Sequence, residues 1–213
     1  MRHWPWWFWL PISAGIALRI AGLTASPLWY DESFSLAMAR LPLLDMVRTA
    51  SLDFHPPLWE MISWVSVRLF GINEFGLRLP ALLASVGVLL LAADFAHRLL
   101  TPSAAALGLA ALAVLPYQLW LAQDGRGYAV MSLLYLAAAW FAFKRSWLGL
   151  TATLGLLLYI NLASPFYVLT IGVLCIGWWS SRFEVRRYAL SGLIAIGSFA
   201  PWLSSYIHAA GAK

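Results

Sequence analysis

The chain has 213 residues, of which 62% are hydrophobic and 11% are charged, whereas soluble domains are about 45–50% apolar and about 25% charged. This composition excludes a water-soluble globular domain. The formal net charge of +5 comes from basic residues scattered between apolar stretches, which excludes the continuous basic surface that nucleic-acid binding needs. A single cysteine, Cys175, excludes an intrachain disulfide and a cluster of thiolate ligands.

Seven apolar stretches predict membrane-spanning helices, since crossing about 30 Å of hydrocarbon takes about 20 residues at 1.5 Å each. The 13 tryptophans and 11 prolines favour helices with aromatic anchors at the membrane surface and with starts or breaks at proline. We therefore predict an all-α fold, a polytopic membrane helical bundle of about seven transmembrane helices. The predicted spans are residues 4–24, 75–96, 103–122, 128–143, 147–161, 165–179 and 188–207.

An eighth apolar segment, residues 57–70, is short for a span. Its 14 residues reach only about 21 Å as a helix, and they include Glu60 and Arg68. We predict that this segment lies along the membrane surface, with Trp59 and Trp64 as its anchors. It then belongs to the first extracytoplasmic loop, residues 25–74, together with a short helix that ends near Arg40.

The charges predict the orientation of the bundle. With residues 57–70 lying flat, seven basic residues fall on one face beside only two acidic residues, and the positive-inside rule makes this face cytoplasmic. We predict one transmembrane module over residues 1–213, without a soluble domain, whose amino terminus is cytoplasmic and whose long loop is outside. The basic residues are Arg2, Arg98, Lys144, Arg145, Arg182, Arg186 and Arg187, and the acidic residues are Asp94 and Glu184.

Asp31 and Glu32 begin the short helix of the first loop, directly after Trp29 and Tyr30. Acids in a first turn commonly cap a helix and complement its dipole, so taken alone this pair supports a structural role and a catalytic role equally. A carboxylate beside aromatic rings at a membrane surface is partly desolvated, which suits a general base. Asp31 is therefore the candidate catalytic base, with Glu32 as a supporting residue.

Asp53 and His55 precede two prolines that suit the first turn of the flat helix. A lone histidine usually caps a helix or faces solvent. His55, however, is on the same predicted face as Asp31 and Arg126, where it can donate a hydrogen bond to an anionic group. We include His55 as a candidate binding residue and Asp53 as a supporting residue.

Arg126 lies between Gly125 and Gly127 in a predicted outer turn between two spans. An arginine at the membrane surface often does no more than reach water with its charged end. Here the two glycines allow a ligand to approach the backbone, and a guanidinium matches the oxygen atoms of a phosphate. The polar residues Gln123, Asp124 and Tyr128 belong to the same cluster. Of these, Gln123 and Tyr128 are supporting candidates.

Five segments, taken in their order and spacing, resemble the membrane module of GT-C glycosyltransferases of the dolichyl-phosphate-mannose protein mannosyltransferase-like (PMT/ArnT-like) group. The resemblance covers nearly the whole chain. The segments are WYDE (29–32), DFHPPL (53–58), LFGINEFGLRLP (69–80), QDGRGY (123–128) and APWL (200–203).

The resemblance implies an inverting enzyme that moves a sugar from a polyprenyl-phosphate donor to an acceptor on the extracytoplasmic side. It implies that Asp31 is the catalytic base and that His55 and Arg126 bind the donor phosphate. It also implies that residues 57–70 form an interfacial helix, in agreement with their length and charge. The expected partners are this lipid donor and the bilayer, not nucleic acid.

Two departures from the family pattern leave an alternative open. Relatives usually have a His-Tyr pair where this chain has Asn161-Leu162-Ala163-Ser164, and they are commonly about twice as long. The alternative is a non-catalytic lipid-binding or scaffold subunit, or one part of a split glycosyltransferase whose partner chain supplies the carboxy-terminal part. No cofactor is indicated, although a divalent metal is left open. A transporter ranks last, because Arg19 and Asp94 lie toward the ends of their spans.

Overall fold

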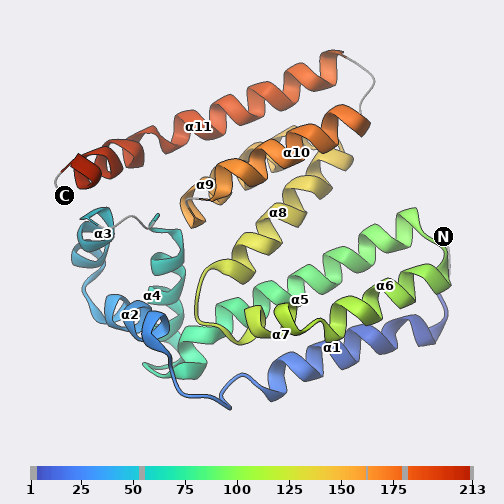
Figure 1. The fold of residues 1–213 in the computed structure, drawn as a ribbon, viewed down its shortest axis with the longest axis horizontal. Coiled ribbons are helices and arrows are strands. Elements are labelled where there is room, and N and C mark those ends of the chain that lie inside the picture. Colours follow the sequence, from blue (N-terminus) through green and yellow to red (C-terminus); the bar gives the residue numbers. More distant parts are fainter. Residues whose placement is uncertain (1–3, 53–55, 162, 179–181, 212–213) are drawn as a thin grey trace. The chain divides into compact units, whose positions relative to one another are not determined.

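The computed structural model describes residues 4–52, 56–161, 163–178 and 182–211. Within these ranges the regular structure is helical and contains no strand, which confirms the predicted all-α fold. A short 3₁₀ helix, η1 (Trp6–Trp9), precedes the α-helices (Figure 1). These are α1 (Leu10–Ala21), α2 (Tyr30–Arg40), α3 (Leu43–Leu52), α4 (Leu58–Phe70), α5 (Glu74–Leu99), α6 (Pro102–Val114), α7 (Pro116–Gln123), α8 (Tyr128–Phe143), α9 (Trp147–Ile160), α10 (Ser164–Trp178) and α11 (Arg182–Gly211).

Local sequence explains several helix starts. Asn73 caps α5, because its side-chain oxygen accepts a hydrogen bond from the backbone N–H of Gly76 at 2.9 Å. Thr101 caps α6 in the same way. Pro102 and Pro116 are the first residues of α6 and α7, where a missing N–H leaves no intrahelical bond unmade. Helices therefore begin where the sequence offers a cap or a proline.

The predicted span 103–122 is not one straight helix. The first part, α6, ends at Val114, and α7 begins at Pro116 with an axis that is bent by 54° from that of α6. Proline has no backbone N–H, and its ring clashes with the carbonyl four residues earlier, so an α-helix kinks or breaks there. The sequence predicted helix over these residues but not the bend.

The lengths of the helices bear on the predicted spans. Among the described residues, α5 is long and apolar enough to cross a membrane by itself, and the bent pair α6 and α7 passes the same test when taken as one span. Three of the other predicted spans, α8, α9 and α10, are apolar helices of 14 to 16 residues. The number of seven spans stays a prediction.

The chain divides into two compact units. The first unit comprises Met1–Leu36 and Ser66–Leu133, and the second comprises Ala37–Val65 and Leu134–Lys213. Residues of α2, α4 and α8 are shared between the two units.

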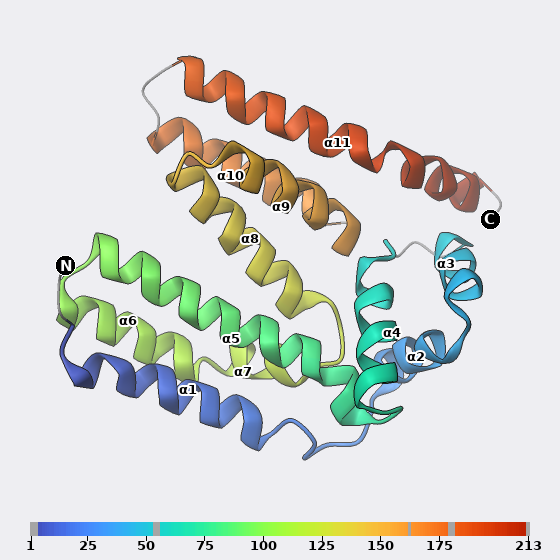
Figure 2. The same cartoon turned by 180° about the vertical axis from the view of Figure 1, so that it is seen from behind.

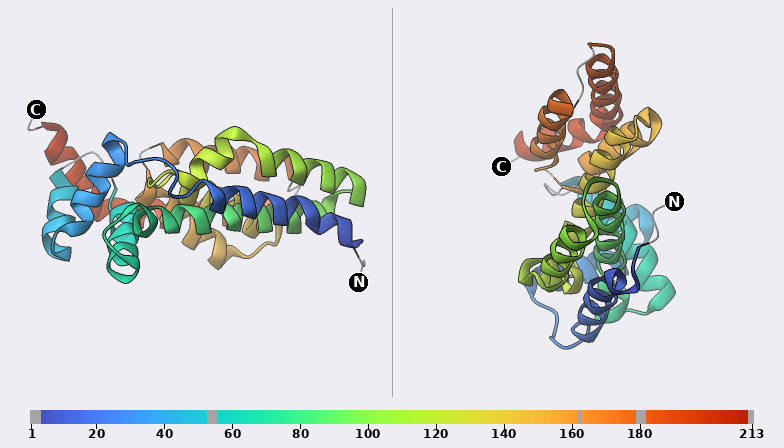
Figure 3. Two further views of the ribbon diagram at one scale, coloured as in Figure 1. Left: turned by 90° about the horizontal axis from the view of Figure 1, so that it is seen from below. Right: turned by 90° about the vertical axis from the view of Figure 1, so that its right-hand side faces the viewer.

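In the first unit, α1 packs on α5 and α6, and α5 also packs on α6 and α7. Figures 1 and 3 show α1, α5 and α6 lying side by side. Alanines at the contact allow the helices to approach closely. The buried cluster between them consists of Phe8, Ile12, Ala93, Ala105 and Leu109.

In the second unit, α11 packs along α9 and contacts α10 and α3 (Figure 2). Met46 and Ala50 of α3 are buried together with Met38, and Trp202 of α11 packs against this cluster. The APWL segment at residues 200–203 therefore has a packing role in this unit, because its tryptophan covers the apolar face of α3.

Helix α4 forms where the flat segment was predicted, but its tryptophans face the protein. Trp59 is only 4% exposed, and the indole N–H of Trp64 donates to the carbonyl oxygen of Leu41 at 3.0 Å. Trp59 therefore cannot serve as the predicted anchor. The exposed apolar side chains of α4 include Met61, Val65 and Leu69, which share one helix face because they are spaced four residues apart.

Candidate active site

A group of polar residues of the first unit converges where the start of α2, the second turn of α5 and the turn between α7 and α8 meet. Glu32 is the centre of this arrangement and is fully buried. Its Oε1 accepts from Arg78 Nε at 2.7 Å and its Oε2 accepts from Arg78 Nη2 at 2.7 Å. Two parallel bonds between a guanidinium and a carboxylate are the strongest geometry for such a pair. The ion pair thus fixes the start of α2 to α5.

The remaining bonds of Glu32 and Arg78 complete this network. Glu32 Oε1 also accepts from the backbone N–H of Gly125 at 2.7 Å, and Oε2 accepts from the backbone N–H of Trp29 at 3.3 Å. Arg78 donates to the carbonyl oxygens of three residues in the segment that follows α1: Leu23 at 2.9 Å, Ser26 at 2.9 Å and Pro27 at 3.2 Å. A buried charge pair is favourable only when its other hydrogen-bonding groups are satisfied, and these contacts satisfy them.

The glycine at position 125 is required by this geometry. A Cβ atom at Gly125 would lie 2.8 Å from side-chain carbons of Leu77 and 3.0 Å from Glu32 Oε1. Any larger side chain would push the turn away from Glu32. The glycines beside Arg126 were expected to allow a ligand close to the backbone, and at Gly125 the close neighbour is the protein itself.

Arg126 is held beside the first turn of α2 and is 8% exposed. Its Nη1 donates to Ser35 Oγ at 3.1 Å and, more weakly, to the backbone carbonyl oxygen of Asp31 at 3.4 Å. The structure thus brings two of the predicted site residues, Asp31 and Arg126, together. They come from positions 95 residues apart in the chain.

Asp31 differs from its neighbour Glu32 in its surroundings. Its side chain is partly exposed, and among the described residues no hydrogen bond or ion pair reaches its carboxylate. A partly exposed carboxylate that accepts no hydrogen bond can take a proton from an incoming group. The two adjacent acids therefore have different roles. Glu32 holds the start of α2 in place, whereas the carboxylate of Asp31 has no donor among the described residues.

Asp124 is a second buried acid in the site, with 3% of its surface exposed. Its Oδ1 accepts from the indole N–H of Trp29 at 3.0 Å, and its buried Oδ2 has no hydrogen-bond partner in the described part of the chain. Burial raises the pKa of the Asp124 carboxyl to about 6. The hydrogen bond from Trp29 and the charge of Arg126 oppose this rise, and the carboxylate of Glu32 adds to it.

The supporting candidates have separate positions. Gln123 Nε2 donates to the carbonyl oxygen of Leu18 at 3.3 Å, at the end of α1. Tyr128 stacks on Trp120 with ring centroids 6.3 Å apart. Asp53 and His55 lie outside the described residues. Among the residues that the structure does describe, no three His, Cys, Asp or Glu side chains group as metal ligands.

Sequence reasoning missed Arg78, Ser35 and the Trp29 indole as parts of the site. A signal for Arg78 existed: an arginine inside an apolar predicted span needs a partner, and Glu32 lay in the adjoining loop. No comparable signal marked Ser35, because a serine in an amphipathic helix has many ordinary roles.

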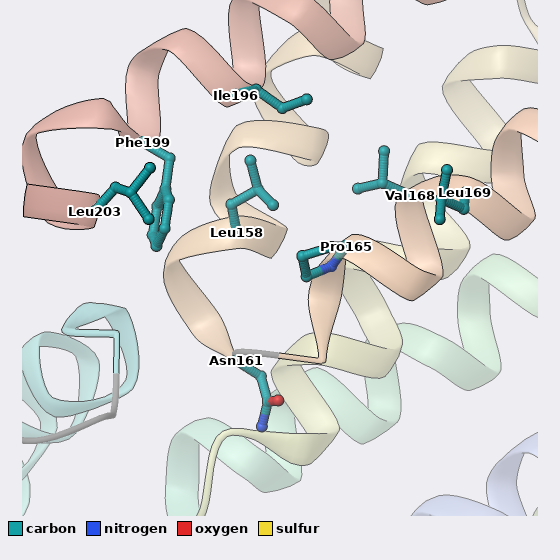
Figure 4. A pocket seen from close by; sticks show the side chains of 8 residues that line it. All are labelled: Leu158, Asn161, Pro165, Val168, Leu169, Ile196, Phe199 and Leu203. Carbon is teal, nitrogen blue, oxygen red and sulfur yellow. The ribbon is translucent and has the colours of Figure 1, made fainter. Parts of the chain in front are cut away.

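The second unit contains an apolar cavity of about 390 Å³ between α9, α10 and α11 (Figure 4). Asn161 is its one polar lining residue. Relatives were expected to have a His-Tyr pair near Asn161, and here Asn161 Oδ1 accepts from the backbone N–H of Ala163 at 2.8 Å. The apolar lining consists of Leu158, Pro165, Val168, Leu169, Ile196, Phe199 and Leu203.

Comparison with known proteins identifies a family. Residues 54–204 match the family model described as dolichyl-phosphate-mannose-protein mannosyltransferase, which is more than two thirds of the chain. Arg78, Asp124 and Arg126 lie inside the matched segment, whereas Asp31 and Glu32 precede it. No curated protein and no solved structure matches the chain.

Proposed function

Because the chain belongs to the dolichyl-phosphate-mannose-protein mannosyltransferase family, which makes it a glycosyltransferase of the mannosyltransferase type, we propose that it transfers a sugar from a polyprenyl-phosphate donor to an extracytoplasmic acceptor, with inversion at the anomeric carbon. The observation that carries the proposal is that the buried guanidinium of Arg126 contacts the backbone of Asp31, whose side chain is partly exposed. These two residues supply the two charges that the reaction needs.

Asp31 is the base in this proposal. Its carboxylate takes the proton of an acceptor hydroxyl as the hydroxyl oxygen forms a bond to the anomeric carbon of the sugar. The bond between that carbon and the phosphate oxygen breaks, and the polyprenyl phosphate leaves with the electron pair. One direct displacement inverts the anomeric configuration. The proton ends on Asp31, and the charge ends on the leaving phosphate.

Arg126 is the phosphate ligand in this proposal. A guanidinium presents N–H donors in a fork that matches two phosphate oxygens. Burial excludes water from Arg126, which strengthens its attraction to a leaving group that gains negative charge. His55, by the family resemblance, is a second ligand of the same phosphate.

The polyprenyl chain of such a donor needs an apolar surface. The cavity between α9, α10 and α11 has one polar lining residue, Asn161, and a volume of about 390 Å³. Cavities of about 300–1,000 Å³ with mainly hydrophobic linings are typical of small-molecule sites. The lining of this cavity therefore has the apolar chemistry that suits a polyprenyl group.

A sugar-release assay with a panel of polyprenyl-phosphate sugars tests this function. The Asp31→Asn variant is expected to lower turnover by about 10²-fold or more, the range for loss of acid–base catalysis, with donor binding nearly unchanged. The Arg126→Ala variant is expected to weaken donor binding by about 1.5–3 kcal/mol, because a charged hydrogen-bond partner of the phosphate is lost.

The matched control for this assay is Asp45→Asn. Asp45 also lies in the first turn of a helix, but its side chain is 55% exposed and pairs with Arg48. This variant is expected to keep full turnover. An active enzyme whose Asp31→Asn variant keeps full turnover would overturn the assignment of the base. A wild-type protein that binds the donor but transfers nothing would favour the scaffold or split-enzyme alternative.

A further inference from the structure

Arg19 is a fully buried cation in the apolar helix α1. Its Nε donates to Ser85 Oγ at 2.8 Å, and its Nη1 donates to the carbonyl oxygens of Gly15 at 2.9 Å and Ala113 at 3.1 Å. Its Nη2 reaches the carbonyl oxygen of Leu112 at 3.5 Å. In the described part of the chain all of these partners are neutral oxygens. The arrangement differs from that of Arg78, which is neutralised by a carboxylate.

Two of the carbonyls that Arg19 contacts, those of Leu112 and Ala113, are left without helical donors by the break between α6 and α7. In a continuous helix the carbonyl of Leu112 would accept from the N–H of residue 116, but proline has none. Ala113 also lies in the last turn of α6, where carbonyls lack helical partners and the helix dipole is negative. Carbonyls without donors are strongly unfavourable in apolar surroundings. Arg19 supplies both the donors and the positive charge.

Helix α7 makes a second contact of this kind, with the end of α1. Gln123, its last residue, donates from Nε2 to the carbonyl oxygens of Leu18 at 3.3 Å and Arg19 at 3.5 Å, in the last turn of α1. This approach depends on Gly22, since a Cβ atom there would lie 2.1 Å from Gln123 Nε2. Side chains thus cover two helix ends: Arg19 of α1 covers the end of α6, and Gln123 of α7 covers the end of α1.

These contacts fix the start of the turn that carries Arg126, the cation of the candidate site. Gln123 is followed directly by the turn that carries Gly125 onto Glu32 and Arg126 onto Ser35. We propose that Arg19 is a positioning residue, which holds the bend between α6 and α7 so that α7 delivers Arg126 to the candidate site. Arg19 contacts none of the candidate catalytic groups, so it acts through α7. The effect on activity rests on the proposed function.

The experiment compares Arg19→Met with the double variant Arg19→Met/Pro116→Ala. The single variant leaves buried carbonyls without donors, so its thermal unfolding temperature and its kcat/KM for sugar release should both fall. The double variant restores an N–H at position 116 and lets α6 and α7 straighten. Its unfolding temperature should recover, while kcat/KM stays lowered by about 10²-fold, the scale that a misplacement of about 1 Å can cause. Arg98→Met, which removes an exposed arginine paired with Asp94, is the matched control and should change neither.

A distance measurement tests the same proposal without an activity assay. Spin labels are placed at the exposed positions Leu18 and Trp120, in a background with Cys175→Ser. Trp120 lies four residues past the break, about 6 Å along the helix axis, so full straightening through 54° moves it by roughly 5 Å. The double variant should show a shift of this size, whereas Pro116→Ala alone, which keeps Arg19, and Arg98→Met should show none.

Three outcomes would overturn the proposal. The first is an Arg19→Met variant whose kcat/KM stays within twofold of wild type. The second is a double variant that regains both stability and kcat/KM, since Arg19 would then serve stability alone. The third is a double variant that does not fold, because the restored N–H should replace the lost donors. If the wild-type protein releases no sugar from any donor, the proposed function fails, and the label distance still decides whether Arg19 positions α7.

Discussion

Asp31 and Glu32 show how residue environment separates two identical chemical groups. Both lie in the first turn of α2, where either carboxylate could cap the helix. Glu32 takes the capping role, because it reaches back to the N–H of Trp29 from the third helical position, as in a capping box. Arg78 and Gly125 are also bound to Glu32, whereas no hydrogen bond within the described part of the chain reaches the carboxylate of Asp31. Replacement of Glu32 should therefore destabilise the folded site, whereas replacement of Asp31 should lower turnover.

Asp124 provides a pH test at the residue scale. Its pKa is about 6 in the folded protein, above the ordinary value of 3.8, so the folded state binds this proton more tightly than the unfolded state. The stability that the group contributes is complete below about pH 4 and is lost as the pH rises through about 6. The Asp124→Asn variant should remove this loss, and its unfolding temperature should fall less than that of wild type between pH 4.5 and 7.5.

Thermal unfolding in detergent at several pH values measures this difference. The slope attributable to Asp124 is at most about 1.4 kcal/mol per pH unit. Asp45→Asn, a change of an exposed carboxylate, should leave the wild-type pH dependence in place. Parallel curves for wild type and Asp124→Asn would contradict the burial argument.

At the scale of elements, α4 shows two different faces. Glu60 and Trp59 are buried, while Met61, Val65 and Leu69 are exposed and lie four residues apart on one face. A helix of 13 residues is too short to cross a bilayer, which takes about 20 residues. This exposed apolar face is suited to lie on a membrane surface with the axis of the helix parallel to it.

Depth measurements test the orientation of α4. Fluorescent labels at Met61→Cys and Leu69→Cys should be quenched most by lipids with shallow quenchers, and both labels should have the same depth. If the helix crossed the bilayer, the two positions would differ in depth by about 12 Å, since they are eight residues apart at 1.5 Å per residue. Label depths that differ by this amount would contradict the flat placement.

For the whole molecule, the charges supply the main evidence for orientation. The two acids on the predicted cytoplasmic face each pair with an arginine: Asp94 with Arg98 at 3.2 Å and Glu184 with Arg145 at 2.6 Å. These pairs leave the excess positive charge of that face unchanged. The positive-inside rule therefore still favours an amino terminus in the cytoplasm.

Cysteine labelling tests this orientation in sealed cells. A cysteine at Ser33, in the first loop, should react with a membrane-impermeant thiol reagent from outside, and one at Ser146, in the turn between α8 and α9, should not. The native Cys175 is buried and serves as the background. Labelling of Ser146→Cys from outside would contradict the predicted orientation.

The sequence by itself determined the helices and the membership of the family. Apolar stretches, prolines and caps such as Asn73 are local signals, and the helices α5, α8 and α9 begin and end within three residues of their predicted bounds. The residue types of the site were also readable, since Asp31 and Arg126 were named from their chemistry. Both kinds of inference need only neighbours in the chain.

The tertiary structure decided which of these groups meet. Arg126 reaches Asp31 across 95 positions of the chain, and Glu32 reaches Gly125 across 93. No local pattern sets such contacts, because they depend on where separate helices pack and on the 54° bend at Pro116. For the same reason, only the structure showed that Glu32 is bound by Arg78 while Asp31 stays open, and that Arg19 is paired with the carbonyls at a helix break.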